Sequence, residues 1–176
     1  GKAPDSLLTL TPERQMAAGG EARGALTTAL IVRAPALPRK LDTNRIAVQV
    51  DATSVAYLTK TAWVEKPDRL MRMMLTETLS AATGALVLDE ATLGAAGGPI
   101  LDGALIEFGV DARSNEVVII YDALYSAKPG QVVKRRFEAR ERLSKVEADA
   151  VAAAMNRIAN ETAQAVAAWI GIQPGG

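Results

Sequence analysis

Apolar residues recur with a helical period near the end of the chain, and this is its clearest pattern. Between residues 150 and 169 they return every three or four positions, which predicts an amphipathic helix of about six turns ending near Gly171. Ser144 and Glu147 stand three positions apart just before this stretch. That spacing predicts a capping box, in which the two side chains bond the first free amides of the helix.

A second helical repeat lies in the middle of the chain. Leucine and methionine recur at three- and four-residue steps between residues 70 and 82. Pro67 suits the first helical position, where a missing N–H leaves no hydrogen bond unmade, and Gly84 suits a left-handed end. The pattern therefore predicts a second amphipathic helix that begins at Pro67 and ends at Gly84.

Stretches rich in β-branched and apolar residues predict the strands. A short strand is expected at residues 7–10, a buried one at 25–33, and a hairpin of two alternating pieces within residues 44–64. Three long strands are expected at residues 100–113, 116–127 and 131–143, and the Ser-Asn and Pro-Gly turns between them favour an antiparallel meander. Together the elements predict an α+β fold, a mainly antiparallel β-sheet with two amphipathic helices packed on one face.

The chain is expected to hold one domain and a leading segment. Glycines 19, 20 and 24 follow the short strand near the start, so residues 1–24 are expected to be a flexible N-terminal tether that includes this strand. Residues 25–172 are expected to form a single α+β domain, because their number suits one hydrophobic core.

Composition narrows the chemistry that the chain could perform. Its 176 residues include no cysteine and no histidine, which excludes thiol nucleophiles, imidazole bases and Cys/His zinc sites. Twenty basic residues balance twenty acidic ones, so nothing favours nucleic acid as a partner. The longest uncharged stretch, residues 162–176, is too short to span a membrane. The chain is expected to be no enzyme and to use no cofactor or metal.

A catalytic alternative is a hydrolase that uses two neighbouring carboxylates. Asp89 and Glu90 form the densest carboxylate pair in the chain, and two facing carboxylates would serve a hydrolase. Neighbouring side chains in an extended segment point to opposite sides, however. The pair is therefore better explained as solvated loop charge.

Charge is distributed unevenly between two neighbouring segments. Residues 89–122 carry seven acids and one base, whereas residues 128–145 carry seven bases and two acids. In the basic segment one parity holds five charged residues and the other four apolar ones, which predicts a strand with one charged face. The charged residues are Lys134, Arg136, Glu138, Arg140 and Arg142, and the apolar ones are Val133, Phe137, Ala139 and Leu143. That face is either solvated with cross-strand ion pairs or a polar interface with a partner or a second copy. The candidate interface residues on it are Arg136 and Arg140.

Aromatic residues are scarce, at 4% of the chain. Tyr57 and Trp63 share one parity six positions apart. Core packing is the simplest explanation for both. They also complete the list of candidate interface residues, since aromatic side chains dominate the binding energy of many interfaces.

The order of several short motifs resembles a known family. Leu-Thr-Leu-Thr-Pro at residues 8–12 precedes a strand and proline loop at 32–40 and then Leu-Asp-Thr-Asn-Arg-Ile at 41–46. Thr-Ala-Trp-Val-Glu-Lys-Pro at residues 61–67 opens a leucine-bearing helix. This order resembles the ABC-type transport auxiliary lipoprotein family, which accompanies MCE-type lipid transport systems and includes the PqiC-like proteins.

The resemblance implies a role that the residues alone do not. It implies a non-enzymatic auxiliary component of an ABC/MCE-type system that moves lipids or other hydrophobic compounds across the cell envelope. It also implies a place on the periplasmic side of the outer membrane, held by a lipidated cysteine preceding Gly1. The implied partners are an MCE-domain protein or ABC transporter subunits, a lipid, and further copies of the chain. The alternative is a periplasmic carrier of a small hydrophobic ligand or lipid with an apolar pocket between helices and sheet.

Overall fold

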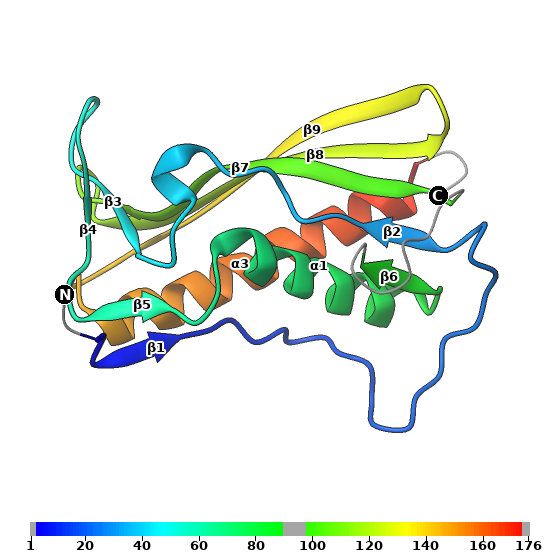
Figure 1. Ribbon diagram of the computed structural model, residues 1–176, viewed down its shortest axis with the longest axis horizontal. Helices are drawn as coiled ribbons and strands as arrows, with labels where there is room; N and C mark the ends of the chain where they lie inside the picture. Colours follow the sequence, from blue (N-terminus) through cyan, green and yellow to red (C-terminus); the bar gives the residue numbers. More distant parts are fainter. Residues whose placement is uncertain (1–2, 90–97, 174–176) are drawn as a thin grey trace.

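The computed structural model describes residues 3–89 and 98–173, and it shows a long sheet lying over a layer of two helices (Figure 1). The helices are α1, Pro67–Thr83, and α3, Ala148–Gly171. The three long strands are β7, Ile100–Asp111, β8, Glu116–Lys128, and β9, Gln131–Arg142. The shorter elements are β1 (Ser6–Leu8), β2 (Leu30–Val32), η1 (Arg39–Leu41), β3 (Ala47–Gln49), β4 (Val55–Tyr57), β5 (Thr61–Trp63) and β6 (Val87–Asp89).

The main sheet is built on the meander that turn chemistry predicts. Strand β8 pairs antiparallel with both β7 and β9 along nearly their whole lengths. The other edge of β7 carries two short strands in parallel, β2 at its start and β3 at its end. The hairpin partner β4 then joins β3, β6 joins β2, and β1 pairs parallel with β5 in a separate small sheet. The predicted α+β fold is confirmed, and its sheet is mixed.

Glycine makes one of the parallel pairings possible. Ala47 of β3 lies beside Gly109 of β7. A Cβ atom on Gly109 would stand 2.3 Å from the carbonyl oxygen of Ala47, far inside van der Waals contact. The bare backbone at this position therefore lets β3 approach β7 closely enough to pair.

The two helices begin in different ways. Helix α1 starts with Pro67 at its first position and ends at Gly84, whose φ of +67° is left-handed, as the sequence predicts. Helix α3 starts after Glu147, which makes no side-chain capping bond. The predicted Ser144–Glu147 capping box is therefore wrong. Residues 144–147 instead connect β9 to the helix layer. Just before them, the amide of Leu143 donates to the carbonyl of Asn115 at 2.7 Å.

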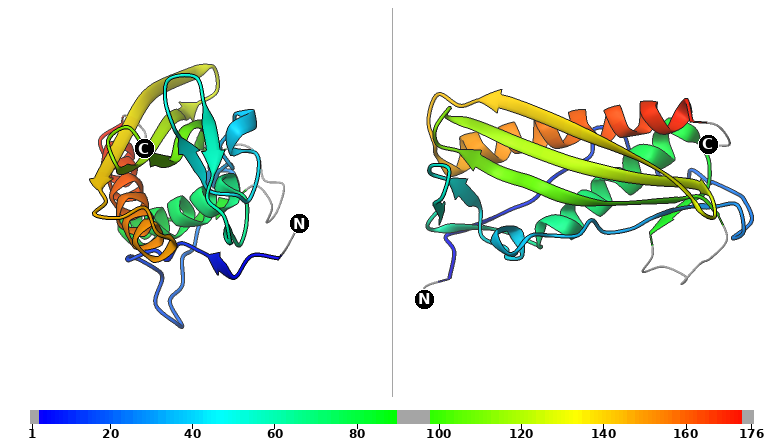
Figure 2. Two further views of the ribbon diagram at one scale, coloured as in Figure 1. Left: turned by 90° about the vertical axis from the view of Figure 1, so that its left-hand side faces the viewer. Right: turned by 90° about the horizontal axis from the view of Figure 1, so that it is seen from above.

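The core fills the space between the two layers. Both helices lie on the same side of the long strands (Figure 2). There α1 buries a stripe of leucine and methionine side chains, and α3 buries one built mainly of alanine, valine and isoleucine. Trp169 of α3 packs edge-on against Tyr125 and Phe137 of the sheet, with ring centroids 6.1 and 5.6 Å apart. Within the described ranges, no helix is long and apolar enough to cross a membrane.

The segment that precedes β2 crosses the helix layer. Leu10 is 2% exposed and belongs to the core. The amide of Thr11 donates to Asn156 of α3, and the amide of Glu13 donates to Asn160, both at 2.7 Å. These contacts fasten residues 10–13 to α3, while the role of residues 1–24 as a tether stays a prediction.

Candidate functional site

The side chains of β7, β8 and β9 that point away from the helices form the charged face. Strand alternation produces it, because Phe137 and Ala139 point inward and are buried while Arg136 and Arg140 point outward. The register sets Arg136 opposite Asp122 of β8. The two segments of opposite charge therefore meet as neighbouring strands, and their side chains pair across the sheet.

An ion pair with two hydrogen bonds on the charged face joins Arg136 to Asp122. The guanidinium donates from Nε to Oδ1 at 2.7 Å and from its terminal nitrogen to Oδ2 at 2.9 Å. Lys134 Nζ lies 3.8 Å from the same carboxylate. The Asp122 side chain is 6% exposed, and the hydrogen bonds from Arg136 hold the pKa of its carboxyl below the usual range, against the opposing effect of burial.

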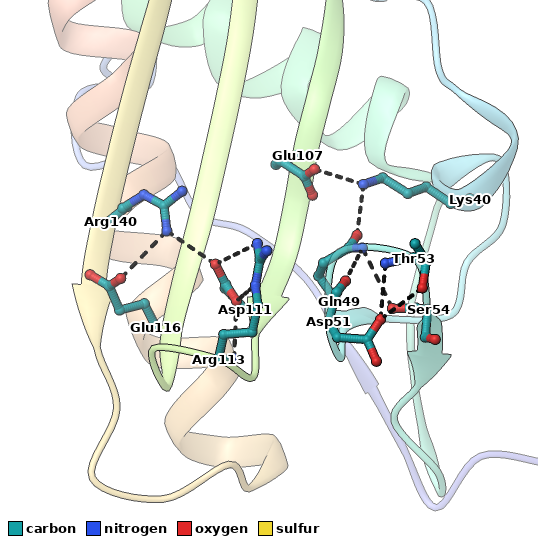
Figure 3. Close-up of polar contacts among 10 residues, drawn as sticks. All are labelled: Lys40, Gln49, Asp51, Thr53, Ser54, Glu107, Asp111, Arg113, Glu116 and Arg140. Carbon is teal, nitrogen blue, oxygen red and sulfur yellow. Dashed lines mark hydrogen bonds and ion pairs between the residues drawn. The ribbon is translucent and has the colours of Figure 1, made fainter.

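A second cluster surrounds Arg140 at the other end of β9 (Figure 3). One terminal nitrogen of Arg140 lies 3.4 Å from Asp111 Oδ2 and 3.4 Å from Glu116 Oε1. Its Nε donates to Glu138 at 2.6 Å. Arg113 binds the other side of Asp111, with Nε at 3.0 Å from Oδ1. Hydrogen bonds from Arg113 are the main reason that the pKa of Asp111 lies below its usual range.

Lys40 connects this face to the edge of the sheet. Its ammonium donates to Glu107 of β7 at 2.7 Å and to the side-chain oxygen of Gln49 of β3 at 3.1 Å (Figure 3). A shallow hollow of about 100 Å³ lies between this contact and the Arg140 cluster, with Val118 and Ile120 among its lining residues. The charged face thus combines paired charges with an apolar floor.

The charged face is better suited to binding a partner than to catalysis. Each carboxylate of the two clusters has a basic partner, so none is an unpaired base facing a cleft. No group of three or more acidic residues in the described part of the chain could hold a metal ion. A flat array of paired charges around apolar side chains resembles the polar, partly apolar surfaces through which proteins recognise one another.

The four candidate interface residues lie in three settings. Arg136 and Arg140 share the charged face. Tyr57 lies beside it, where its hydroxyl donates to the carbonyl of Lys40 at 2.9 Å and the Arg45 guanidinium covers its ring at 4.9 Å. Trp63 is completely buried. Its ring packs at 5.3 Å from that of Phe108, which is the position of a core residue.

The carboxylate pair and the apolar pocket considered from the sequence do not contribute to the charged face. Glu90, one member of the adjacent carboxylate pair, lies outside the described residues. The hollow of about 730 Å³ near the N-terminal end is a surface feature lined by residues 3–5, 44–45 and 58–62. It does not lie between helices and sheet, where a hydrophobic carrier would hold its ligand.

Sequence reasoning missed Asn160, which matters for the fold. It belongs to an Asn-Glu-Thr glycosylation signal that a helical position makes meaningless. The residue is 1% exposed, and its amide holds residues 11–13 of the N-terminal segment. A polar residue at an apolar position of the helical repeat is the signal that could have identified it.

Comparison with known proteins gives a family and solved structures of similar fold. The family of ABC-type transport auxiliary lipoprotein components matches residues 8–167. A crystal structure of an uncharacterized protein superposes with a TM-score of 0.72 at 19% identity, covering 94% of this chain and 99% of its own. A protein from Xanthomonas campestris superposes with a TM-score of 0.69 at 18% identity, covering 96% of this chain and 93% of its own. No curated protein sequence matches the chain.

Proposed function

The chain belongs to the family of ABC-type transport auxiliary lipoprotein components, and from this premise we propose that it is a non-enzymatic subunit that binds a transporter partner through the charged face. In this proposal the system moves lipids or other hydrophobic compounds across the cell envelope. The partner is an MCE-domain protein or another transporter subunit. The chain is held by an N-terminal lipid on the periplasmic side of the outer membrane.

The charged face is the observation that carries the proposal. It places three ion-paired groups, around Asp122, Arg140 and Lys40, on the side of the sheet opposite the helices. Charges arranged in this way set the register of a complex and reject wrongly charged partners. The half-buried Ile120 between them adds apolar area that a partner would cover.

A charge swap on this face tests the proposal. Glu138→Lys combined with Arg142→Glu preserves net charge and changes two exposed side chains of β9. The matched control combines Arg69→Glu on α1 with Glu161→Lys on α3, which are also exposed. Each variant is purified in mild detergent from cells that express the whole transport system. We expect the MCE-domain protein to copurify with wild type and with the helix control, and to be lost from the charged-face variant.

Two outcomes would contradict the proposal. Absence of any transporter subunit from the wild-type preparation would remove the partner altogether. Equal recovery of the partner with both swaps would place the contact elsewhere on the domain. Native mass spectrometry of the same samples also reports how many copies of the chain are present.

The alternative function, a carrier of a small hydrophobic ligand, has less support. A carrier needs an enclosed apolar cavity. The space between helices and sheet holds the fully buried side chains of Trp63, Tyr121 and Phe108, and the hollow of about 730 Å³ opens on the surface. A lipid found at one copy per chain by native mass spectrometry would favour the carrier.

A further inference from the structure

The turn between β8 and β9 combines exposed apolar and basic side chains. This hairpin tip comprises residues 127–135 and turns at Gly130, whose φ of +83° is left-handed. It lies at the opposite end of the long axis from the first described residues (Figures 1 and 2). The tip therefore projects at an end of the domain, away from the clusters around Arg140 and Lys40.

Apolar side chains at the tip are unusually open to solvent. Val132 is 61% exposed and Val133 is 47% exposed. Ile172, at the end of α3, is 77% exposed, and its neighbour Gln173 lines a hollow of about 140 Å³ together with Val133. Because adjacent strand residues point to opposite faces, the two valines make the tip apolar on both sides.

Basic side chains surround these valines. Lys128, Lys134 and Arg135 are all exposed, and the sequence has no acid between residues 123 and 137. Within the described residues neither Lys128 nor Arg135 forms an ion pair, whereas Lys134 lies 3.8 Å from the Asp122 carboxylate. The tip thus differs from the charged face, where Arg136, Arg140 and Lys40 each have an acidic partner.

We propose that the hairpin tip docks end-on to an anionic lipid surface. The valines enter the interfacial region, and the bases behind them meet the phosphate groups of the lipids. A turn of a few residues that is apolar on both sides cannot supply the roughly 800 Å² per partner of a standard protein interface, but it matches insertion into a fluid surface. This inference goes beyond the proposed function and does not depend on any transporter partner.

Cosedimentation with lipid vesicles tests the docking. The chain is mixed with vesicles of phosphatidylethanolamine and phosphatidylglycerol, and separately with vesicles of phosphatidylcholine alone. We expect binding to the anionic vesicles, weaker binding as salt is raised, and little binding to the neutral ones. Lys128→Gln combined with Arg135→Gln should weaken the binding, by about fivefold for each base removed.

A valine variant isolates the apolar contribution. Val132→Ser combined with Val133→Ser should abolish most of the binding without unfolding the protein, because both side chains are already exposed. Val50→Ser combined with Val64→Ser is the matched control, since these valines are 43% and 49% exposed outside the tip. The control should bind like wild type. Circular dichroism and thermal melting check that each variant keeps the fold.

Three results would overturn the proposal. The first is a wild-type chain that stays in the supernatant with anionic vesicles, as expected if the tip binds an acidic protein surface. The second is a valine variant of the tip that sediments as well as wild type, and the third is a control variant that loses binding to the same extent. The charge swap at Glu138 and Arg142 tests the partner separately, so the two proposals can fail independently.

Discussion

Asn160 shows how one buried amide holds two distant parts of the chain together. Its Oδ1 accepts from the amide of Glu13 at 2.7 Å, and its Nδ2 donates to the carbonyls of Thr11 and Asn156 at 3.0 and 2.9 Å. A helix side chain here bonds the backbone of an extended segment much as a neighbouring strand would. Because Asn160 is 1% exposed, water does not replace these bonds when they are lost.

Replacing Asn160 should loosen the N-terminal segment. Asn160→Ala leaves the amide of Glu13 and the carbonyl of Thr11 without their partner, so we expect the free energy of unfolding to fall by about 1–3 kcal/mol. Urea denaturation measures that change, and limited proteolysis should show faster cleavage within residues 11–16. Asn156→Ala removes only the more exposed bond to Thr11 and should cost less. Equal stability of both variants and wild type would contradict this role.

Trp63 is expected to act through the core. Its side chain is completely buried against Phe108, so Trp63→Ala should lower the free energy of unfolding by about 3–5 kcal/mol. Trp63→Phe should cost less, because the ring is retained and the indole N–H has no hydrogen-bond partner among the described residues. Thermal melting and a partner pull-down distinguish a core role of Trp63 from an interface role. Lost partner binding with unchanged melting of Trp63→Ala would mark an interface residue.

At the scale of elements, the pair of β8 and β9 should have a pH-dependent stability. The pKa of Asp122 is lowered in the folded state, chiefly by Arg136. A lowered pKa stabilises the fold above the unfolded value near 3.9, and that contribution is lost as the pH falls through the folded value. Arg136→Gln should therefore lower the melting temperature at pH 7, and the gap to wild type should narrow as the pH falls below about 4.

Arg142→Gln is the matched control for this experiment. Arg142 lies on the same face of β9, but opposite the more exposed Glu116. It should leave both the melting temperature at pH 7 and its dependence on pH close to wild type. A constant difference between Arg136→Gln and wild type from pH 7 to pH 2 would show that the guanidinium contributes packing and not charge.

The predicted and unpredicted elements differ in the sequence distance that their contacts span. The two helices and the β7–β8–β9 meander depend on local periods and short turns, and both are visible in the sequence. Cross-strand pairing of Arg136 with Asp122 follows from the same turn, since these residues are 14 positions apart. The parallel pairing of β2 and β3 with β7 joins segments more than 60 residues apart, and no local pattern encodes it.

The same reasoning explains which parts of the candidate site were missed. Arg136 and Arg140 are found from strand parity alone. Lys40 reaches Glu107 across 67 positions, so its place at the edge of the charged face follows from the fold. The failed capping box has a geometric cause, because residues 144–147 are needed to connect the edge strand to the helix layer. Local signals therefore indicate the candidate face but not its boundaries.

At the scale of the whole molecule, the candidate surfaces are centred at different places, although Lys134 of the tip also borders the Asp122 pair of the charged face. The charged face runs along the outside of the sheet, the hairpin tip lies at one end, and the first described residues lie at the other (Figure 2). A subunit arranged in this way can bind a protein along its side and a lipid surface at its tip without the two competing. The swap on β9 and the valine variant of the tip should then act independently in both binding assays.

The leading segment should behave as part of the folded body over residues 5–16. Strand β1 pairs with β5, Leu10 is buried, and Asn156 and Asn160 hold the backbone that follows. A chain that starts at residue 17 should lose at least about 2 kcal/mol of stability from the burial of Leu10 alone, whereas one that starts at Asp5 should melt like the whole chain. Differential scanning calorimetry compares the three proteins. Identical melting of all three proteins would instead favour a loosely attached tether across residues 1–24.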